Sequence, residues 1–265
     1  MTTLGIHHLA ALEVDPVEFV TLASESGCQE VSLFVQAINP KAGYPLVTAE
    51  NSAAMAERLR ATGIRLANIE CFMLTPKTDV ESFRPALECG AGLGARSATA
   101  LLYDSDTARI SDNLGRLCEM TEDMGLRVGV EFLALAPAWN TLQQVAQLVS
   151  KLSRPNLGLG LDLLHLVRSG SDMAEVAALP PGLVAYAQLC DGGDLRVTQD
   201  YVEEAAARRL APGDGCFPIQ DFLKALPAGT HIEIEVPQPA DRPARARVQH
   251  IVESTRRQLQ LAGLA

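Results

Sequence analysis

The chain has 265 residues, of which 48% are hydrophobic and 20% are charged, so it can form a sizeable core and is not expected to be disordered. Its formal net charge of −10 argues against a nucleic-acid-binding protein, because such proteins normally carry a basic face. Six cysteines without a CxxC pair, a first segment unlike a signal peptide and the absence of a membrane-length apolar run together predict a soluble cytoplasmic protein that does not bind membranes.

Strand-like apolar runs alternate with helical patterns along the whole chain. In chain order, the expected strands cover 5–12, 30–35, 65–74, 97–103, 127–133, 157–163, 183–190 and 231–236. The expected helices lie around 15–26, 48–62, 80–90, 107–125, 141–152, 172–178, 217–226 and 243–262. Helix-start signals are Asp15 followed by Pro16, the pair Asn140–Thr141, and Ser169 to Ser171.

Eight strands that alternate strictly with eight helices predict a parallel sheet with right-handed crossovers. A doubly wound sheet would need a glycine-rich turn after an early strand, and the segment ALEVDP after the first expected strand contains no glycine. The count of strands and the chain length favour a closed barrel of the α/β class, the (β/α)8 or TIM barrel. Since no Gly-, Ser- or Pro-rich linker divides the chain, we expect a single domain over 1–265.

Four consecutive expected strands each carry one oxygen-bearing side chain near the C-terminal end, where such barrels place their chemistry. These residues are Glu131, Asp162, Gln188 and Glu235. Three carboxylates close together would repel one another unless a cation lay among them. All four donors are hard oxygen ligands, so the sequence predicts one divalent cation, Mn²⁺ or Mg²⁺, with Co²⁺ also compatible. The alternative is that Glu131 and Asp162 form salt bridges with lysines of neighbouring loops.

Five segments of the chain resemble the xylose isomerase-like barrel superfamily, the sugar isomerases and epimerases of the AP endonuclease 2 type. They are VGVEF with Glu131, LGLDLLH with Asp162 and His165, AQLCDG with Gln188 and Asp191, IEIEVP with Glu235, and EAAARRLAPGDG with Arg209 and Asp214. The resemblance covers nearly the whole chain. It implies that Glu131 and Glu235 bind the metal and act as an acid/base pair, and that His165 contacts a substrate oxygen or relays a proton. Many members place a histidine where this chain has Gln188, and that departure resembles the dehydroshikimate dehydratase branch.

Both branches begin by removing a proton next to a carbonyl group, with a metal at the carbonyl oxygen and a glutamate as base. We therefore expect a divalent-metal-dependent enzyme acting on a small polyhydroxylated substrate (a polyol, sugar or keto acid) as an isomerase or epimerase of carbohydrate metabolism. The alternative is a metal-dependent dehydratase, a lyase, in which His165 would supply the proton to the leaving hydroxyl. A DNA-repair endonuclease of the same superfamily is disfavoured, because its histidine-rich zinc site contrasts with only five histidines here. A non-catalytic metabolite binder is disfavoured because the ligand set is intact.

Several other residues are candidate substrate contacts. One of His7 and His8 should end the first strand near the substrate, and the other should face the helices. Glu70 either lines the pocket or pairs with Arg65.

Trp139 on the loop after the fifth strand is a candidate aromatic wall, or a cover for the barrel rim. Arg196 is a candidate substrate clamp, with a solvated loop arginine as the alternative. Glu233 lies on the same strand face as Glu235, and we favour Glu235 as the ligand because it lies nearer the strand end. Barrels of this kind often form homo-oligomers, but the sequence identifies no contact surface.

Overall fold

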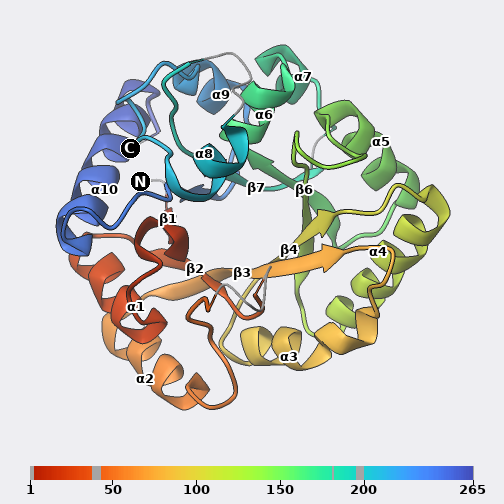
Figure 1. The fold of residues 1–265 in the computed structure, drawn as a ribbon, viewed down its shortest axis with the longest axis horizontal. Coiled ribbons are helices and arrows are strands. Elements are labelled where there is room, and N and C mark those ends of the chain that lie inside the picture. Colours follow the sequence, from red (N-terminus) through yellow and green to blue (C-terminus); the bar gives the residue numbers. More distant parts are fainter. Residues whose placement is uncertain (1–2, 38–42, 181, 195–199, 265) are drawn as a thin grey trace.

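The computed structural model describes residues 3–37, 43–180, 182–194 and 200–264. Eight parallel strands close into a barrel in chain order, with helices around the outside (Figure 1). The strands are β1 Leu4–His7, β2 Glu30–Phe34, β3 Arg65–Leu74, β4 Ser97–Leu102, β5 Arg127–Glu131, β6 Leu157–Asp162, β7 Val184–Leu189 and β8 Ile232–Ile234. The predicted (β/α)8 barrel is confirmed.

The helices that cover the barrel are α1 Pro16–Glu25, α2 Ser52–Thr62, α3 Arg84–Gly92, α4 Thr107–Glu122, α5 Leu142–Leu152, α6 Leu163–Ser169, α7 Met173–Ala177, α8 Tyr201–Ala207, α9 Ile219–Ala225 and α10 Ala244–Leu261. Two 3₁₀ turns, His8–Ala11 and Val80–Phe83, complete the described helical segments. Each of the eight expected helices corresponds to one of these, whereas α6 and α8 were not expected.

The differences from the sequence expectations are local. The first strand ends at His7 rather than at residue 12, because His7 Nδ1 accepts a hydrogen bond from the Leu9 backbone and starts a 3₁₀ turn. Helix α6 follows β6 without a loop, so its seven residues were hidden within the apolar run. The expected cap at Ser169 to Ser171 is wrong, because Asp172 caps α7 through the backbone N–H of Ala174.

Parallel strands covered by helices are buried on both faces, which explains why most of them read as continuous apolar runs. Two glycines, Gly129 and Gly160, lie where the Tyr186 ring fills the barrel interior. A Cβ added at Gly129 would lie 2.3 Å from a ring carbon of Tyr186, and one at Gly160 would lie 2.5 Å from its hydroxyl oxygen. Gly129 of β5 and Gly160 of β6 therefore leave the space that the Tyr186 ring occupies.

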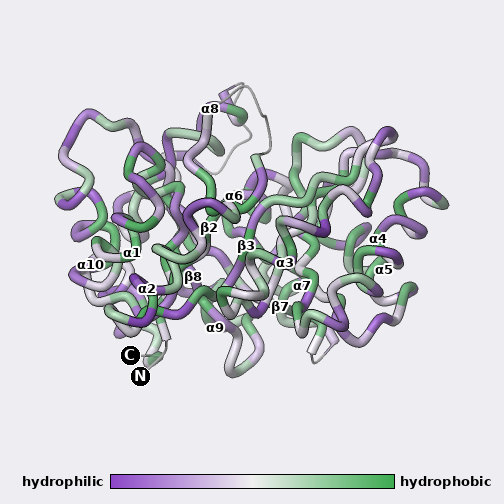
Figure 2. Tube along the Cα trace, turned by 90° about the horizontal axis from the view of Figure 1, so that it is seen from below, coloured by the Kyte–Doolittle hydropathy of each residue, from purple (hydrophilic) through white to green (hydrophobic). Residues whose placement is uncertain are grey.

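The two ends of the barrel differ in what they carry. Helix α8 lies beyond the carboxyl ends of the strands, whereas the labelled N- and C-termini lie close together near the opposite end (Figure 2).

All six cysteines are free thiols, as expected from their spacing, and four of them are buried. In the described part of the chain, no helix combines the length and apolar character needed to cross a membrane.

Candidate active site

The four predicted ligands lie at the carboxyl end of the barrel, as expected. Glu131 and Asp162 are the last residues of β5 and β6, and Gln188 lies in β7 level with Asp162. Glu235 follows the end of β8 by one residue. No more than 5% of any of the four residues is exposed, so their charges interact in a site that water screens poorly.

Glu131, Asp162 and His165 form one cluster whose candidate ligand atoms all lie within 4.8 Å of one another. His165 Nε2 lies 3.1 Å from Glu131 Oε1 and 3.6 Å from Asp162 Oδ2. Asp162 also caps helix α6, since its Oδ1 accepts a hydrogen bond of 2.7 Å from the Leu164 backbone. The cap fixes His165 on the first turn of α6, three residues beyond Asp162 and above the same strand end.

The other ring nitrogen of His165 is held by Tyr201, the first residue of α8. The Tyr201 hydroxyl hydrogen-bonds to His165 Nδ1, and both side chains are buried. A fixed hydrogen-bond partner at Nδ1 restricts the orientation and the tautomer of the imidazole, and therefore whether Nε2 carries a proton. Tyr201 was not identified from the sequence, because nothing in its local pattern points to a residue 36 positions earlier.

Arg209 inserts a positive charge between two of the predicted metal ligands. Its Nη1 donates to Asp162 Oδ2 at 2.6 Å and its Nη2 donates to Glu235 Oε1 at 2.8 Å. The alternative pairing of Asp162 with a loop lysine is therefore wrong, because its salt-bridge partner is this buried arginine. Glu235 Oε2 is buried without a hydrogen-bond partner among the described residues.

Asp191, beyond the end of β7, fixes the loop that carries Arg209. Its carboxylate accepts backbone hydrogen bonds from Gly213 and Gly215 at 2.9 and 3.0 Å. Backbone pairing of Asp191 with Leu210 ties this loop to β7. Asp214 of the same loop is exposed and pairs instead with His250, at 2.6 Å.

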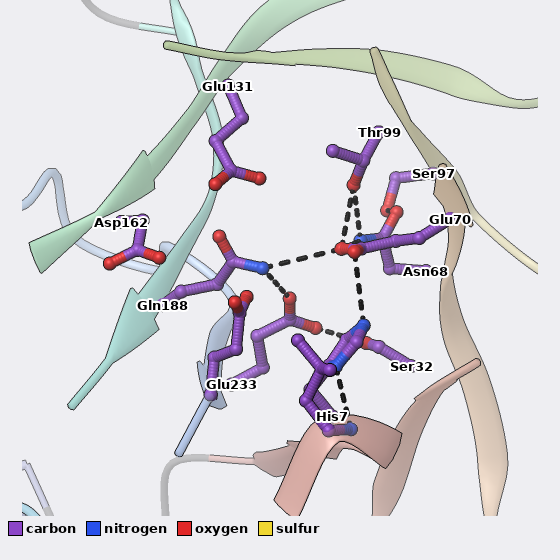
Figure 3. A network of polar contacts seen from close by, with 12 residues as sticks. His7, Ser32, Asn68, Glu70, Ser97, Thr99, Glu131, Asp162, Gln188 and Glu233 are labelled. Carbon is purple, nitrogen blue, oxygen red and sulfur yellow. Dashed lines mark hydrogen bonds and ion pairs between the residues drawn. The ribbon is translucent and has the colours of Figure 1, made fainter. Parts of the chain in front are cut away.

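Below the strand ends, a hydrogen-bonded network fills the barrel (Figure 3). Gln188 Nε2 donates to Glu233 Oε1 at 2.8 Å and lies 3.4 Å from Glu70 Oε1, while Gln188 Oε1 is buried and has no hydrogen-bond partner within the described part of the chain. Glu70 also pairs with His7 Nε2 at 3.1 Å and accepts from Thr99 at 2.9 Å. Glu233 is therefore engaged within the network, whereas Glu235 retains a free oxygen.

The buried charges shift one another's protonation. Burial, together with the carboxylates of Glu235 and Asp162, raises the pKa of Glu131 well above its usual range. Burial also raises the pKa of Glu235 to about 8, although Arg209 acts in the opposite direction. Burial lowers the pKa of His165 to about 4. For His7, burial alone would lower the pKa, but Glu70 outweighs it and raises the pKa to about 9.

The remaining sequence candidates are placed as follows. His7 points into the barrel, while His8 contacts the Val14 carbonyl at 2.8 Å and packs on Phe19 of α1. Trp139 donates from Nε1 to the Asp104 carbonyl at 2.8 Å, so its polar edge is engaged by a neighbouring loop.

The alternative pairing of Glu70 with Arg65 is wrong. Arg65 lies at the start of β3 and binds Glu30 at 2.8 Å, whereas Glu70 lies five residues further along the strand. Arg196 lies outside the described residues.

Among the described residues, two groups of side chains could hold a metal ion. They are the cluster of Glu131, Asp162 and His165, and a second group of Glu70, Glu233 and Glu235. In the second group, Glu70 and Glu233 are already engaged by neutral or cationic donors. The unpartnered oxygens of Glu235 and Gln188 are hard donors, which suit a divalent ion.

Comparison with known proteins identifies the family of the chain. The family model described as "Xylose isomerase-like TIM barrel" matches residues 20–258. The chain belongs to this family, which confirms the resemblance seen in the sequence. Members of this superfamily include isomerases, epimerases and a dehydratase.

Individual relatives show how far the likeness extends. The chain is 30% identical over 167 residues to a 3-dehydroshikimate dehydratase of Pseudomonas aeruginosa, a match that covers 58% of this chain and 26% of that protein. A xylose isomerase domain protein from Alicyclobacillus acidocaldarius is 23% identical, with a TM-score of 0.80 over 99% of this chain and 100% of the other. The IolI protein, whose crystal structure contains a zinc atom, is 17% identical, with a TM-score of 0.84 over 99% and 98%.

Proposed function

We propose that this chain is a divalent-metal-dependent dehydratase that removes the proton next to a carbonyl group of a small polyhydroxylated substrate and expels a neighbouring hydroxyl group as water. The observation that carries the proposal is a pair of separate proton-handling groups at one barrel end. One is Glu235, with a free buried oxygen. The other is the series of contacts from Glu131 through His165 to Tyr201, in which Tyr201 hydrogen-bonds to His165.

Glu131, Asp162, Gln188 and Glu235 are the residues that would hold the ion, and Mn²⁺ or Mg²⁺ suits their oxygen donors best. When bound, the ion polarises the substrate carbonyl and makes the neighbouring C–H group more acidic. Arg209 already neutralises part of the same cluster. It orients Asp162 and Glu235 through its two hydrogen bonds.

Glu235 is the proposed base for the first step. Its free Oε2 accepts the proton, and the C–H electron pair forms the new carbon–carbon double bond. The pKa of this carboxyl group, about 8, lies close to neutral pH, and a general base is most effective when its pKa is close to the working pH. Because Arg209 donates to Oε1 of Glu235, Oε1 is the oxygen that would be shared with the ion, and Oε2 is the oxygen available to the substrate.

His165 is the proposed proton donor to the leaving hydroxyl group. Burial keeps its imidazole neutral, so it passes on a proton only as it receives another. Glu131 lies 3.1 Å from Nε2 and helps to orient the ring, whereas the Tyr201 hydroxyl at Nδ1 is the group that returns a proton to the imidazole as Nε2 gives one up. The hydroxyl leaves with its bonding electrons, takes this proton and departs as water.

The dehydratase is favoured over a sugar isomerase or epimerase by Gln188 and by the 30% identical relative. The isomerase or epimerase remains the second candidate, because Glu131 and Glu235 could also return the proton to another carbon or to the opposite face. These enzymes share the first step and differ only in the second.

The test is to incubate the purified protein with Mn²⁺ and 3-dehydroshikimate and to follow ultraviolet absorbance and product mass. Growth of an aromatic chromophore with loss of one water supports the dehydratase. A panel of ketoses in deuterated water tests the alternative: deuterium entering a recovered sugar without loss of water supports the isomerase. No reaction with either set, under Mn²⁺, Mg²⁺, Co²⁺ or Zn²⁺, contradicts both.

A further inference from the structure

A cavity of about 400 Å³ opens at the N-terminal end of the barrel, opposite the candidate active site. Its polar wall comes from the first residues of β2 and β3, from Arg96 before β4, and from His231 before β8. None of these residues takes part in the proposed reaction. The cavity is therefore a separate feature of the molecule.

Three nitrogen-bearing side chains converge on one carboxylate in this wall. Arg96 binds Glu30 through two hydrogen bonds of 2.7 and 2.8 Å, and Arg65 binds it at 2.8 and 2.9 Å. His231 Nδ1 lies 3.0 Å from the second oxygen of Glu30. Even with His231 neutral, two guanidinium groups face one carboxylate among the described lining residues, an excess of positive charge in a chain of net charge −10. His231 Nε2 also lies 3.9 Å from Glu233 Oε2, on the side of the barrel interior.

The burial of these groups determines which charge the cavity presents. The Glu30 side chain is 1% exposed, whereas those of Arg65 and Arg96 are 55% and 50% exposed. The negative charge thus lies behind the guanidinium groups and the positive charge lies in front. The remaining N–H donors of a planar guanidinium match the paired oxygens of a carboxylate or phosphate.

The cavity lining also contains apolar side chains. Leu223 and Leu226 come from α9 and the residue after it, Pro227 continues the turn, and Ile232 begins β8. A lining that combines guanidinium groups with apolar side chains suits a ligand with an oxyanion at one end and an apolar body at the other.

We propose that this cavity binds a small organic anion, whose carboxylate or phosphate contacts Arg65 and Arg96 and whose apolar part packs on the α9–β8 turn. This site lies at the other end of the barrel from the proposed catalytic residues. The proposal of an anion site does not depend on the proposed reaction.

Binding is measured by calorimetry on the chelator-treated protein, with benzoate and phenyl phosphate as probes and the neutral benzamide as control. We expect saturable binding of one anion per chain and at least ten-fold weaker binding of benzamide. The tighter of the two anions identifies the preferred oxyanion. Binding of benzamide as tight as that of benzoate, or no binding of either anion at millimolar concentration, overturns the proposal.

Two variants locate the site. Arg65→Gln removes one cation but keeps the double hydrogen bond between Arg96 and Glu30, so the buried carboxylate remains paired. Ala228→Glu places a competing carboxylate on an exposed residue that lines the cavity. Each should weaken anion binding about ten-fold or more, the scale of one charge-assisted hydrogen bond. Arg84→Gln, a matched change at an exposed arginine paired with Glu81, should have no effect. Unchanged binding in both site variants, with folding verified by circular dichroism, overturns the assignment.

Discussion

The guanidinium of Arg209 lies 2.6 Å from Oδ2 of Asp162, and neither side chain is more than 3% exposed. A cation of the protein's own thus lies against a residue that we expect to hold a metal ion. Because Arg209 also binds Glu235, it is the principal counter-charge of the metal-free cluster. Because of these contacts, we expect a substitution of Arg209 to affect the metal-free protein and the metal-loaded protein differently.

Arg209→Gln should destabilise the metal-free protein by about 3–5 kcal/mol, because it leaves two buried carboxylates without their cationic partner. Bound Mn²⁺ would replace the missing charge, so the loss should be smaller when the metal is saturating. Urea unfolding in chelator and in Mn²⁺ measures both values. The neighbouring Arg208→Gln is the control, since Arg208 is exposed and pairs with Glu203 at 3.0 Å. Equal stabilities of the two variants in chelator would argue against a counter-charge role for Arg209.

Metal affinity should rise with pH. A carboxyl group must lose its proton before it can bind an ion, and the pKa of Glu235 is raised to about 8. Between pH 6 and 8 we therefore expect tighter Mn²⁺ binding and release of protons on binding. Calorimetry in two buffers of different ionisation enthalpy measures the protons released. Glu235→Gln should reduce that number, and an affinity independent of pH over this range would contradict the prediction.

The pair of His7 and Glu70 should make stability fall at alkaline pH. The pKa of His7 is raised from 6.5 to about 9, so its contribution is fully present below pH 6.5 and is lost as the pH rises through about 9. Its size is on the order of 3 kcal/mol. The difference in unfolding free energy between the wild type and His7→Gln, measured from pH 6 to 10, isolates the effect. A difference that stays constant over this pH range would contradict the assignment.

Much of the fold followed from the sequence, because parallel strands covered by helices leave uninterrupted apolar runs and their ends are marked by polar residues. The strand ends placed Glu131 and Asp162 correctly, since the carboxyl ends of parallel strands meet at one side of the barrel. The parts of the site that come from elsewhere were harder to predict. Tyr201 lies 36 residues from its partner His165, and Arg209 lies 47 from Asp162. No periodicity in the sequence encodes such loop and short-helix contacts.

Tyr201→Phe should lower kcat about ten-fold with little change in KM, because it removes the hydroxyl that fixes His165 while it keeps the ring packing. Steady-state kinetics on the substrate identified by the assays above measures both parameters. A large rise in KM for Tyr201→Phe with an unaltered kcat would show instead that the hydroxyl binds the substrate.

The most direct test of the account is a crystal structure of the protein soaked with Mn²⁺, with the ion located by its anomalous scattering. The account predicts one strong peak at the carboxyl end of the barrel, bound by oxygens of Glu131, Asp162, Gln188 and Glu235. No peak there at saturating Mn²⁺, or a peak bound only by Glu70 and Glu233 within the barrel, would contradict it.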